Sequence, residues 1–282
     1  MKSLGPRLLT AVIGIPAVVL VMIISEVWHP LLGIVLGLAS VIMVGEFLYG
    51  RRLLSCIPLA VVCMLYALLM PIVVTEATVT YLLSCLFFIV GFVVILMRHR
   101  RLRFMDFAYA MFGTLLIAFG MSAVSLACIG NGYNVSFFFV LVFLLPWMAD
   151  GGGYFVGSYF GRRKLCPGIS PKKTVEGVLG GTVFCVASAL VMGLVFQFIV
   201  FGGDESVRVN FAGLIVLAIL DSVVSLIGDL SFSLIKRNLK IKDYGTLFPG
   251  HGGMLDRCDS IIFTAPLVVV LGQFMPFLQV VE

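Results

Sequence analysis

Long apolar segments dominate the sequence and limit the folds it can adopt. A helix that crosses a bilayer needs about 20 mostly apolar residues, and nine segments of this 282-residue chain approach that length. They are approximately Leu8–Ile24, Leu31–Leu48, Cys56–Val74, Tyr81–Met97, Ala108–Ile129, Val135–Phe160, Val178–Phe201, Phe211–Ile235 and Ser260–Leu278. Only 12% of the residues are charged, against about 25% in a soluble domain. The sequence therefore predicts an all-α polytopic membrane protein with about nine transmembrane helices.

The basic residues predict how these helices are oriented. When the loops are assigned alternately to two sides, 18 of the 19 basic residues fall on one side, and Arg208 alone falls on the other. The 18 are Lys2, Arg7, Arg51, Arg52, Arg98, Arg100, Arg101, Arg103, Arg162, Arg163, Lys164, Lys172, Lys173, Lys236, Arg237, Lys240, Lys242 and Arg257. Basic loops stay in the cytoplasm, so we expect a cytoplasmic N-terminus and a C-terminus on the far side. No small-x-small cleavage site follows the first span, which we interpret as an uncleaved helix. The short loops suit a bacterial inner membrane.

Polar residues divide the chain into two predicted regions. Residues 1–134 form an N-terminal five-helix membrane region with few polar residues. Residues 135–282 form a four-helix catalytic membrane region with cytoplasmic loops at 161–177 and 236–259. Glu46, near the cytoplasmic end of the second span, is the polar exception in the first region. It is either an interfacial carboxylate that pairs with Arg51 or Arg52, or part of the wall of a functional site.

Carboxylates inside the predicted spans indicate a bound cation. Asp150 lies in the sixth span, and Asp221, Ser225 and Asp229 follow one another at intervals of four residues in the eighth. That spacing places the three on one helix face. A membrane-embedded acid costs about 2.5–3.5 kcal/mol on insertion scales, and the spans contain no basic partner. Hard oxygen ligands near phosphates favour Mg²⁺, and Asp256 could meet Asp229 across two helices to complete the site.

The loop after the sixth span predicts an anion site at a helix start. Ser170 would be the N-cap and Pro171 the first helical residue. Lys172, Lys173 and Thr174 would then lie in the first turn, whose free N–H groups bind anions. No GxxxxGK[ST] motif occurs in the sequence, which excludes a Walker-type nucleotide site.

Small residues recur in the second half of the sixth span. Gly153, Gly157 and Gly161 follow at intervals of four. Such a row lets two membrane helices approach closely. We interpret it as a packing surface rather than a phosphate loop.

The polar loop before the last span carries a dense motif. It reads S-x-x-K-R, four residues, K-D-x-G, and then P-x-H-G-G-x-x-D-R-x-D. The matching residues are Ser233, Lys236, Arg237, Lys242, Asp243, Gly245, Pro249, His251, Gly252, Gly253, Asp256, Arg257 and Asp259. With G-D-L at Gly228–Leu230, the I-S-P-K-K-T-x-E-G run at Ile169–Gly177 and Asp150, this pattern resembles the phosphatidate cytidylyltransferase (CDP-diacylglycerol synthase) family. The resemblance is strong from about Asp150 to Asp259, whereas the first five helices match only in general character.

The resemblance implies an enzyme of phospholipid biosynthesis, a nucleotidyltransferase that converts CTP and phosphatidic acid into CDP-diacylglycerol and pyrophosphate. The lipid phosphate is already ionised at neutral pH, so catalysis needs positioning and charge neutralisation rather than a general base. The implied catalytic residues are Asp229, Asp256, Lys236, Arg237, Asp243, His251 and Arg257. The implied substrate-binding residues are Ser170, Lys172, Lys173, Thr174, Glu176, Lys242, Asp150 and Asp259. Asp229 and Asp256 would bind Mg²⁺, with Asp221 a weaker or outer ligand and a second cation left open.

The expected partners are CTP, phosphatidic acid and membrane lipids, without nucleic acid. The sequence does not determine the oligomeric state, and a homodimer is one option. One rival function is a CTP-dependent lipid kinase. Another is an ion-coupled transporter that uses Asp150, Asp221 and Asp229 as a cation path. Transporters often contain internal repeats and midplane sites, whereas this sequence has no visible repeat and concentrates its polar residues at the cytoplasmic end.

Overall fold

The computed structural model describes residues 16, 18–130, 134–202, 207–248 and 252–280, most of them in helices. The helices are Val18–Val27, α2 (Pro30–Gly50), α3 (Ile57–Val73), α4 (Ala77–Arg98), α5 (Phe104–Ile129), α6 (Val135–Phe160), α7 (Val175–Val195), α8 (Phe211–Asn238) and α9 (Leu255–Phe274). A 3₁₀ turn (Leu53–Ser55) follows α2, and a π-helical turn (Phe196–Val200) extends α7. The strands are β1 (Lys164–Cys166), β2 (Ser170–Thr174), β3 (Val207–Val209) and β4 (Leu278–Val280).

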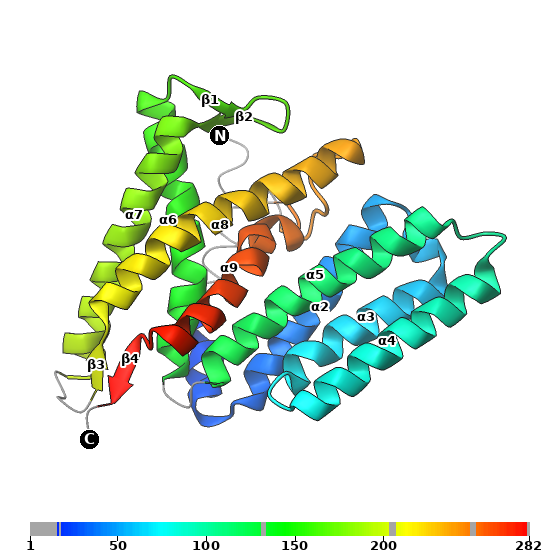
Figure 1. Ribbon diagram of the computed structural model, residues 1–282, viewed down its shortest axis with the longest axis horizontal. Coiled ribbons are helices and arrows are strands. Elements are labelled where there is room, and N and C mark those ends of the chain that lie inside the picture. The colour runs from blue at the N-terminus through cyan, green and yellow to red at the C-terminus, as the bar shows by residue number, and fades with distance from the viewer. Residues whose placement is uncertain (1–15, 17, 131–133, 203–206, 249–251, 281–282) are drawn as a thin grey trace.

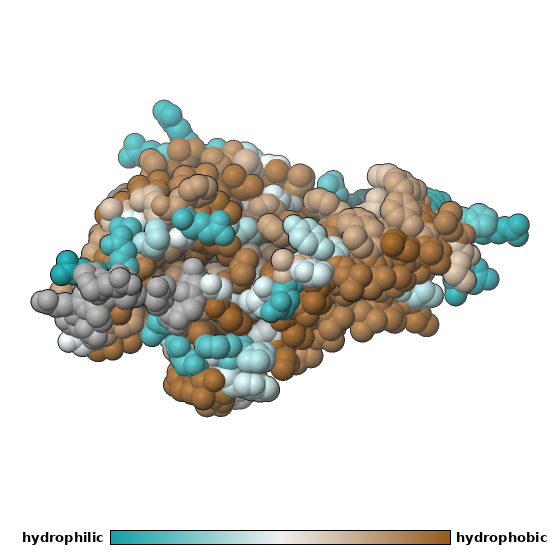
Figure 2. All heavy atoms as spheres, turned by 60° about the horizontal axis from the view of Figure 1, so that its bottom comes forward, coloured by the Kyte–Doolittle hydropathy of each residue, from teal (hydrophilic) through white to brown (hydrophobic). Residues whose placement is uncertain are grey.

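These helices confirm an all-α polytopic membrane protein. Within the described residues, six are long and apolar enough to cross a bilayer: α2, α4, α5, α6, α7 with its π-helical turn, and α8. Large side chains such as Tyr81, Leu96 and Met97 are more than two-thirds exposed (74%, 71% and 77%). Figure 2 shows a mostly hydrophobic face with hydrophilic residues gathered in a few patches. Such a surface is suited to lipid, because a soluble protein rarely exposes large apolar patches.

The ends of the chain differ in detail from the predicted spans. Most of the first span lies outside the described residues. The last helix, α9, begins at Leu255 rather than Ser260, so the charged residues Asp256 and Asp259 belong to its first turns. It ends at Phe274, and Leu278 belongs to β4. The predicted span therefore began too late, because a boundary placed by hydropathy excludes a charged first turn.

Helix α9 connects two groups of helices. Helices α6, α7 and α8 pack against one another, and so do α2, α3 and α5 (Figure 1). Helix α9 contacts α8 of the first group as well as α5 and α2 of the second. One hydrophobic core includes Phe47, Phe137, Phe232 and Ile262. The division into residues 1–134 and 135–282 stays a prediction, but the two regions share this core.

The row of small residues packs α6 against α7, as predicted. A Cβ atom at Gly177 would lie 2.7 Å from the carbonyl oxygen of Gly153, and one at Gly181 would lie 2.5 Å from the carbonyl oxygen of Ala149. A Cβ atom at Gly157 would lie 2.9 Å from the hydroxyl of Thr174. The helices therefore approach too closely for side chains at these positions.

The predicted helix start at Ser170 is wrong. Ser170–Thr174 is strand β2, which pairs with β1 in an antiparallel hairpin at the C-terminal end of α6 (Figure 1). Helix α7 begins at Val175, with Thr174 as its N-cap: the Thr174 hydroxyl accepts a hydrogen bond from the Gly177 N–H (3.1 Å). Thr174 has the extended backbone that an N-cap requires. Lys172 and Lys173 therefore project from a strand, not from a helical first turn.

Candidate active site

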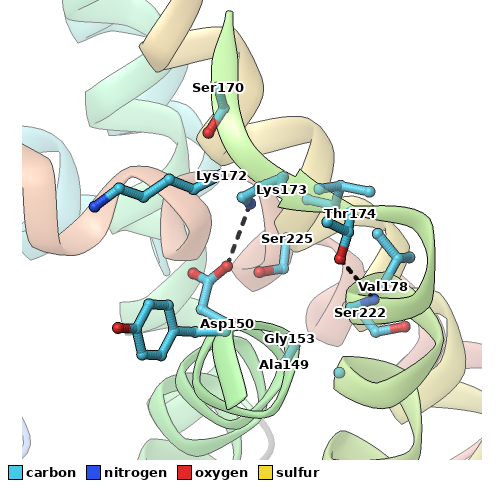
Figure 3. Close-up of a pocket in the computed structure, with 14 residues that line it drawn as sticks. Ala149, Asp150, Gly153, Ser170, Lys172, Lys173, Thr174, Val178, Ser222 and Ser225 are labelled. Carbon is cyan, nitrogen blue, oxygen red and sulfur yellow. Dashed lines mark hydrogen bonds and ion pairs between the residues drawn. The ribbon is translucent and has the colours of Figure 1, made fainter. Parts of the chain in front are cut away.

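A cavity of about 200 Å³ lies beneath the β1–β2 hairpin, between α6, α7 and α8 (Figure 3). The polar residues that line it include Asp150, Ser170, Lys172, Lys173, Ser222 and Ser225. Small residues of the α6–α7 contact line it as well, so the helix packing leaves room beside the charges. The structure thus brings residues of the loop at 161–177 together with residues of three predicted spans.

Lys173 links two helices through their carboxylates. Its Nζ lies 2.6 Å from Oδ2 of Asp229 in α8 and 3.4 Å from Oδ1 of Asp150 in α6. The second oxygen of Asp150 accepts a hydrogen bond from the hydroxyl of Ser260 in α9 (3.2 Å). Burial disfavours the charged form of Lys173, but Asp150 and Asp229 outweigh that cost, so the pKa of Lys173 is raised. The ammonium therefore stays charged at neutral pH.

This contact corrects one step of the sequence argument. The predicted spans contain no basic residue, so the sequence alone predicts that the acids on α8 lack a basic partner. Lys173 reaches Asp229 from the hairpin outside the spans. Figure 3 shows the neighbouring Lys172 extending away from Asp150, and no ion pair of Lys172 occurs among the described residues.

Asp256 is held by three donors at the start of α9. Lys236 Nζ lies 2.8 Å from its Oδ1, and the backbone N–H groups of Tyr244 and Gly253 donate to its Oδ2 (2.8 and 3.1 Å). The side chain of Asp256 is only 4% exposed. These contacts fix one carboxylate from α8, through Lys236, and from two positions in the loop between α8 and α9, through Tyr244 and Gly253.

Further acids lie deeper along α8 and α9. Asp221 is fully buried, and neither of its carboxylate oxygens has a hydrogen-bond partner among the described residues; the same holds for the hydroxyls of Ser225 and Thr264. Asp259 is buried within electrostatic range of Asp229 and Asp150. No group of three or more His, Cys, Asp or Glu side chains is placed to hold a metal ion in the described part of the chain. The side chains here nevertheless present carboxylate and hydroxyl oxygens, which are the ligands that a hard cation prefers.

The remaining predicted site residues lie around this centre. Arg237 donates from Nε to the carbonyl of Ile169 (3.3 Å), which ties the end of α8 to the hairpin. The carboxylate of Glu176 accepts hydrogen bonds from the N–H groups of Arg162 and Arg163, at 3.0 and 3.2 Å. The other three that the structure describes are exposed: Lys242, Asp243 and Arg257. His251 lies outside the described residues.

Glu46 does not pair with Arg51 or Arg52. Arg51 binds Asp106 instead, with Nε 2.6 Å from Oδ1. The carboxylate of Glu46 accepts hydrogen bonds from the backbone N–H groups of Met254 and Leu255 (3.1 and 2.9 Å), at the start of α9. The first alternative is therefore wrong, and Glu46 lies instead against the backbone next to Asp256.

Sequence reasoning missed two residues that hold the site together. Tyr244 contributes its N–H to Asp256, and its buried hydroxyl donates to the carbonyl of Phe232 (3.2 Å). Burial raises the pKa of Tyr244, so its hydroxyl stays a donor. Ser260 holds Asp150. Their positions inside and directly after the charged motif were the available signal.

The family profile and the relatives that match this sequence are all cytidylyltransferases. A profile described as the cytidylyltransferase family matches residues 5–275. The chain is similar to the phosphatidate cytidylyltransferase of Haemophilus influenzae, with 44% identity over 135 residues, 48% of this chain and 45% of that protein. It is also similar to the one of Bacillus subtilis, with 40% identity over 139 residues, 49% of this chain and 48% of that protein. For the one of Staphylococcus saprophyticus the identity is 34% over 179 residues, 61% of each. The chain thus spans about half the length of the curated relatives it matches first.

Proposed function

The chain belongs to the cytidylyltransferase family, and we propose that it transfers the cytidylyl group of CTP to phosphatidic acid, forming CDP-diacylglycerol and pyrophosphate. The observation that carries this proposal is the placement of Lys173 between Asp150 and Asp229 at the wall of a cavity. A reaction between two anionic substrates needs such an array of cations and carboxylates. The names of the bacterial relatives support the same activity.

The chemistry follows from the charges. A phosphate oxygen of the lipid attacks the α-phosphorus of CTP, and the bond from that phosphorus to the bridging oxygen of the β-phosphate breaks. Pyrophosphate leaves with the bonding electrons. The attacking oxygen is already ionised, so the residues need only align the phosphates and offset their repulsion. Lys172, Lys242 and Arg257 are exposed and have room to bind phosphates, whereas Lys173 and Lys236 also hold carboxylates.

The carboxylate oxygens of the acidic residues are suitable ligands for a divalent cation such as Mg²⁺. We propose that Asp229 and Asp256 hold Mg²⁺, with Asp221 as an outer ligand. Bound Mg²⁺ would supply charge neutralisation for the departing pyrophosphate. The contribution of the chain is to hold these carboxylates before substrate arrives, through Lys173 at Asp229 and through three donors at Asp256.

The proposed location is a bacterial inner membrane, with the site facing the cytoplasm. The 18 basic residues assigned to one side support that orientation. The β1–β2 hairpin and the C-terminal end of α8 lie at one end of the molecule (Figure 1), and Arg237 joins them. CTP would enter from water at this end, and the lipid would enter sideways from the bilayer. The proposal requires neither a nucleic acid nor a second copy of the chain.

The test is an assay of purified protein in detergent with phosphatidic acid, Mg²⁺ and CTP labelled at the α-phosphate. Label should enter the lipid fraction, and Asp256→Asn should abolish the transfer. Asp106→Asn is the matched control. It removes a carboxylate from an ion pair with Arg51, away from the cavity, and should leave the transfer unchanged.

Two other outcomes would overturn the proposal. If γ-label entered a lipid alcohol while α-label stayed in water, the protein would be a lipid kinase. If neither label moved in a well-folded preparation, the enzyme assignment would fail, and ion flux in liposomes would be measured next.

A further inference from the structure

We propose that Glu46 is a positioning residue of the active site, which fixes the first turn of α9 and thereby the carboxylate of Asp256. The proposal rests on the proposed function. It places one essential contact in α2, within the N-terminal region whose sequence carries little of the family motif. Glu46 would act through the backbone of α9 rather than by touching a substrate.

Glu46 supplies the cap that α9 lacks from its own sequence. The N-cap residue, Met254, has no side-chain oxygen to accept from the free N–H groups of the first turn. The two carboxylate oxygens of Glu46 accept one N–H each, from Met254 and Leu255. A carboxylate at a helix N-terminus also interacts favourably with the helix dipole. The first turn of α9 is thus ordered by a side chain more than 200 residues earlier (208 from Met254).

Two motif glycines leave the space that Glu46 fills. A Cβ atom at Gly245 would collide with the carboxylate of Glu46, and one at Gly253 would lie 2.5 Å from its Oε2. For both glycines, the three nearest heavy atoms belong to Glu46. Neither position has a positive φ, so backbone conformation does not require glycine there. The glycine of K-D-x-G and the second glycine of H-G-G are therefore explained by the approach of Glu46, whereas the first glycine of H-G-G, Gly252, has a positive φ of 89°.

The same backbone holds Asp256. Asp256 follows Leu255 directly, and its Oδ2 accepts from the N–H groups of Gly253 and Tyr244. Gly253, Met254 and Leu255 thus donate in sequence to two carboxylates, first to Asp256 and then to Glu46. Phe47, next to Glu46, packs against the Tyr244 ring with centroids 5.9 Å apart. Movement of Glu46 would displace both backbone donors of Asp256, the N–H groups of Tyr244 and Gly253.

The chain offers a matched control in Glu26. Its carboxylate accepts hydrogen bonds from the N–H groups of Val135 and Ser136 (3.3 and 2.6 Å), at the start of α6. It therefore also accepts two N–H groups at a helix start, beside the N-cap Asn134, whose side chain accepts from the Phe137 N–H. That contact lies at the opposite end of α6 from the hairpin, about 39 Å away for 26 residues at 1.5 Å each. Glu26→Gln reports the cost of a lost cap without disturbing Asp256.

The experiment compares Glu46→Gln, Glu26→Gln and the unmodified protein in detergent. Glutamine places an amide donor against one N–H group, so one hydrogen bond is lost. Direct binding of Mn²⁺, measured by electron paramagnetic resonance without substrate, should weaken about 10- to 100-fold in Glu46→Gln, as for changes around metal ligands in other proteins. Glu26→Gln should bind Mn²⁺ within about twofold of the unmodified protein, even if both variants melt at lower temperature. Amide exchange of Met254 and Leu255 should accelerate only in Glu46→Gln.

A double-mutant cycle tests the steric argument independently of the Mn²⁺-binding measurement. Gly245→Ala should reduce cytidylyl transfer at least about tenfold, because its methyl displaces Glu46. In a Glu46→Ala background the methyl finds space, so Gly245→Ala should cause little further loss. Contacting residues show such non-additivity, and independent residues do not.

The outcomes separate this proposal from the proposed function. If the unmodified protein transfers no cytidylyl group, the proposed function fails, while amide exchange still tests Glu46. If exchange at Met254 and Leu255 is unchanged in Glu46→Gln, Glu46 does not order α9. Equal weakening of Mn²⁺ binding by both Glu→Gln variants, or additive losses in the cycle, would reduce Glu46 to a general stabilising contact and overturn its positioning role.

Discussion

Replacing Lys173 with methionine should destabilise the protein and make its stability depend on divalent cations. The substitution keeps most of the side-chain volume and removes the ammonium that lies 2.6 Å from Asp229 and 3.4 Å from Asp150. The two carboxylates would then repel each other across α6 and α8. The contact between these helices should loosen beside the cavity.

The size of the effect follows from burial. Breaking a fully buried ion pair costs about 3–5 kcal/mol, and a hydrogen bond to a charged group contributes about 1.5–3 kcal/mol. The side chains of Asp229 and Asp150 are 22% and 44% exposed, so water screens part of the repulsion. We therefore expect Lys173→Met to lower the free energy of unfolding by about 1–3 kcal/mol. At roughly 2–4 °C per kcal/mol for a chain of comparable size, the melting temperature should fall by roughly 2–12 °C.

The assay is thermal melting of the detergent-solubilised protein, first in EDTA and then in Mg²⁺. Because a divalent cation can replace the missing positive charge, Mg²⁺ should raise the melting temperature of Lys173→Met more than that of the unmodified protein. Lys172→Met is the matched control, since Lys172 is exposed and extends away from Asp150 (Figure 3). It should melt like the unmodified protein in both conditions.

Two results would refute the reasoning. Equal melting of Lys173→Met and Lys172→Met in EDTA would mean that the contacts of Lys173 do not stabilise the fold. An equal gain from Mg²⁺ in all three proteins would mean that a divalent cation does not replace the Lys173 ammonium between Asp150 and Asp229.

Three further substitutions test the surrounding structure. Thr174→Val should lower the free energy of unfolding by about 1 kcal/mol, because it removes the N-cap of α7. Thr174→Ser keeps the hydroxyl and should keep the cap. Urea titration in detergent compares the two variants. Gly181→Ala should lower the free energy of unfolding by about 1–3 kcal/mol, since its methyl would press against the backbone of α6. A methyl at Gly151 meets no atom, so Gly151→Ala should have the melting temperature of the unmodified protein. Tyr244→Phe should lower the free energy of unfolding by about 1 kcal/mol, because it removes the hydrogen bond to a carbonyl of α8. The measurement is the rate at which trypsin cleaves the α8–α9 loop, which should increase.

Much of the fold was predictable because the bilayer restricts it. An apolar segment of about 20 residues in lipid must satisfy its backbone hydrogen bonds internally, and a helix does so from local sequence alone. The close α6–α7 contact also followed from local spacing, because Gly153 and Gly157 leave no side chain between the helices. Helix boundaries beside charges were harder to predict. Thr174 rather than Ser170 is the cap of α7, because β1 pairs with the residues before it.

The sequence by itself determined the helical membrane class, the charged motif and the residue types of the site. Only the tertiary structure decided which charges meet. Lys173 reaches Asp229 across 56 positions, and Glu46 reaches Leu255 across 209. Neither pairing leaves a periodic signal, because both depend on how α2, α8, α9 and the β1–β2 hairpin pack. Local sequence specifies hydrogen bonds within a helix, whereas contacts between helices depend on the packing of all of them.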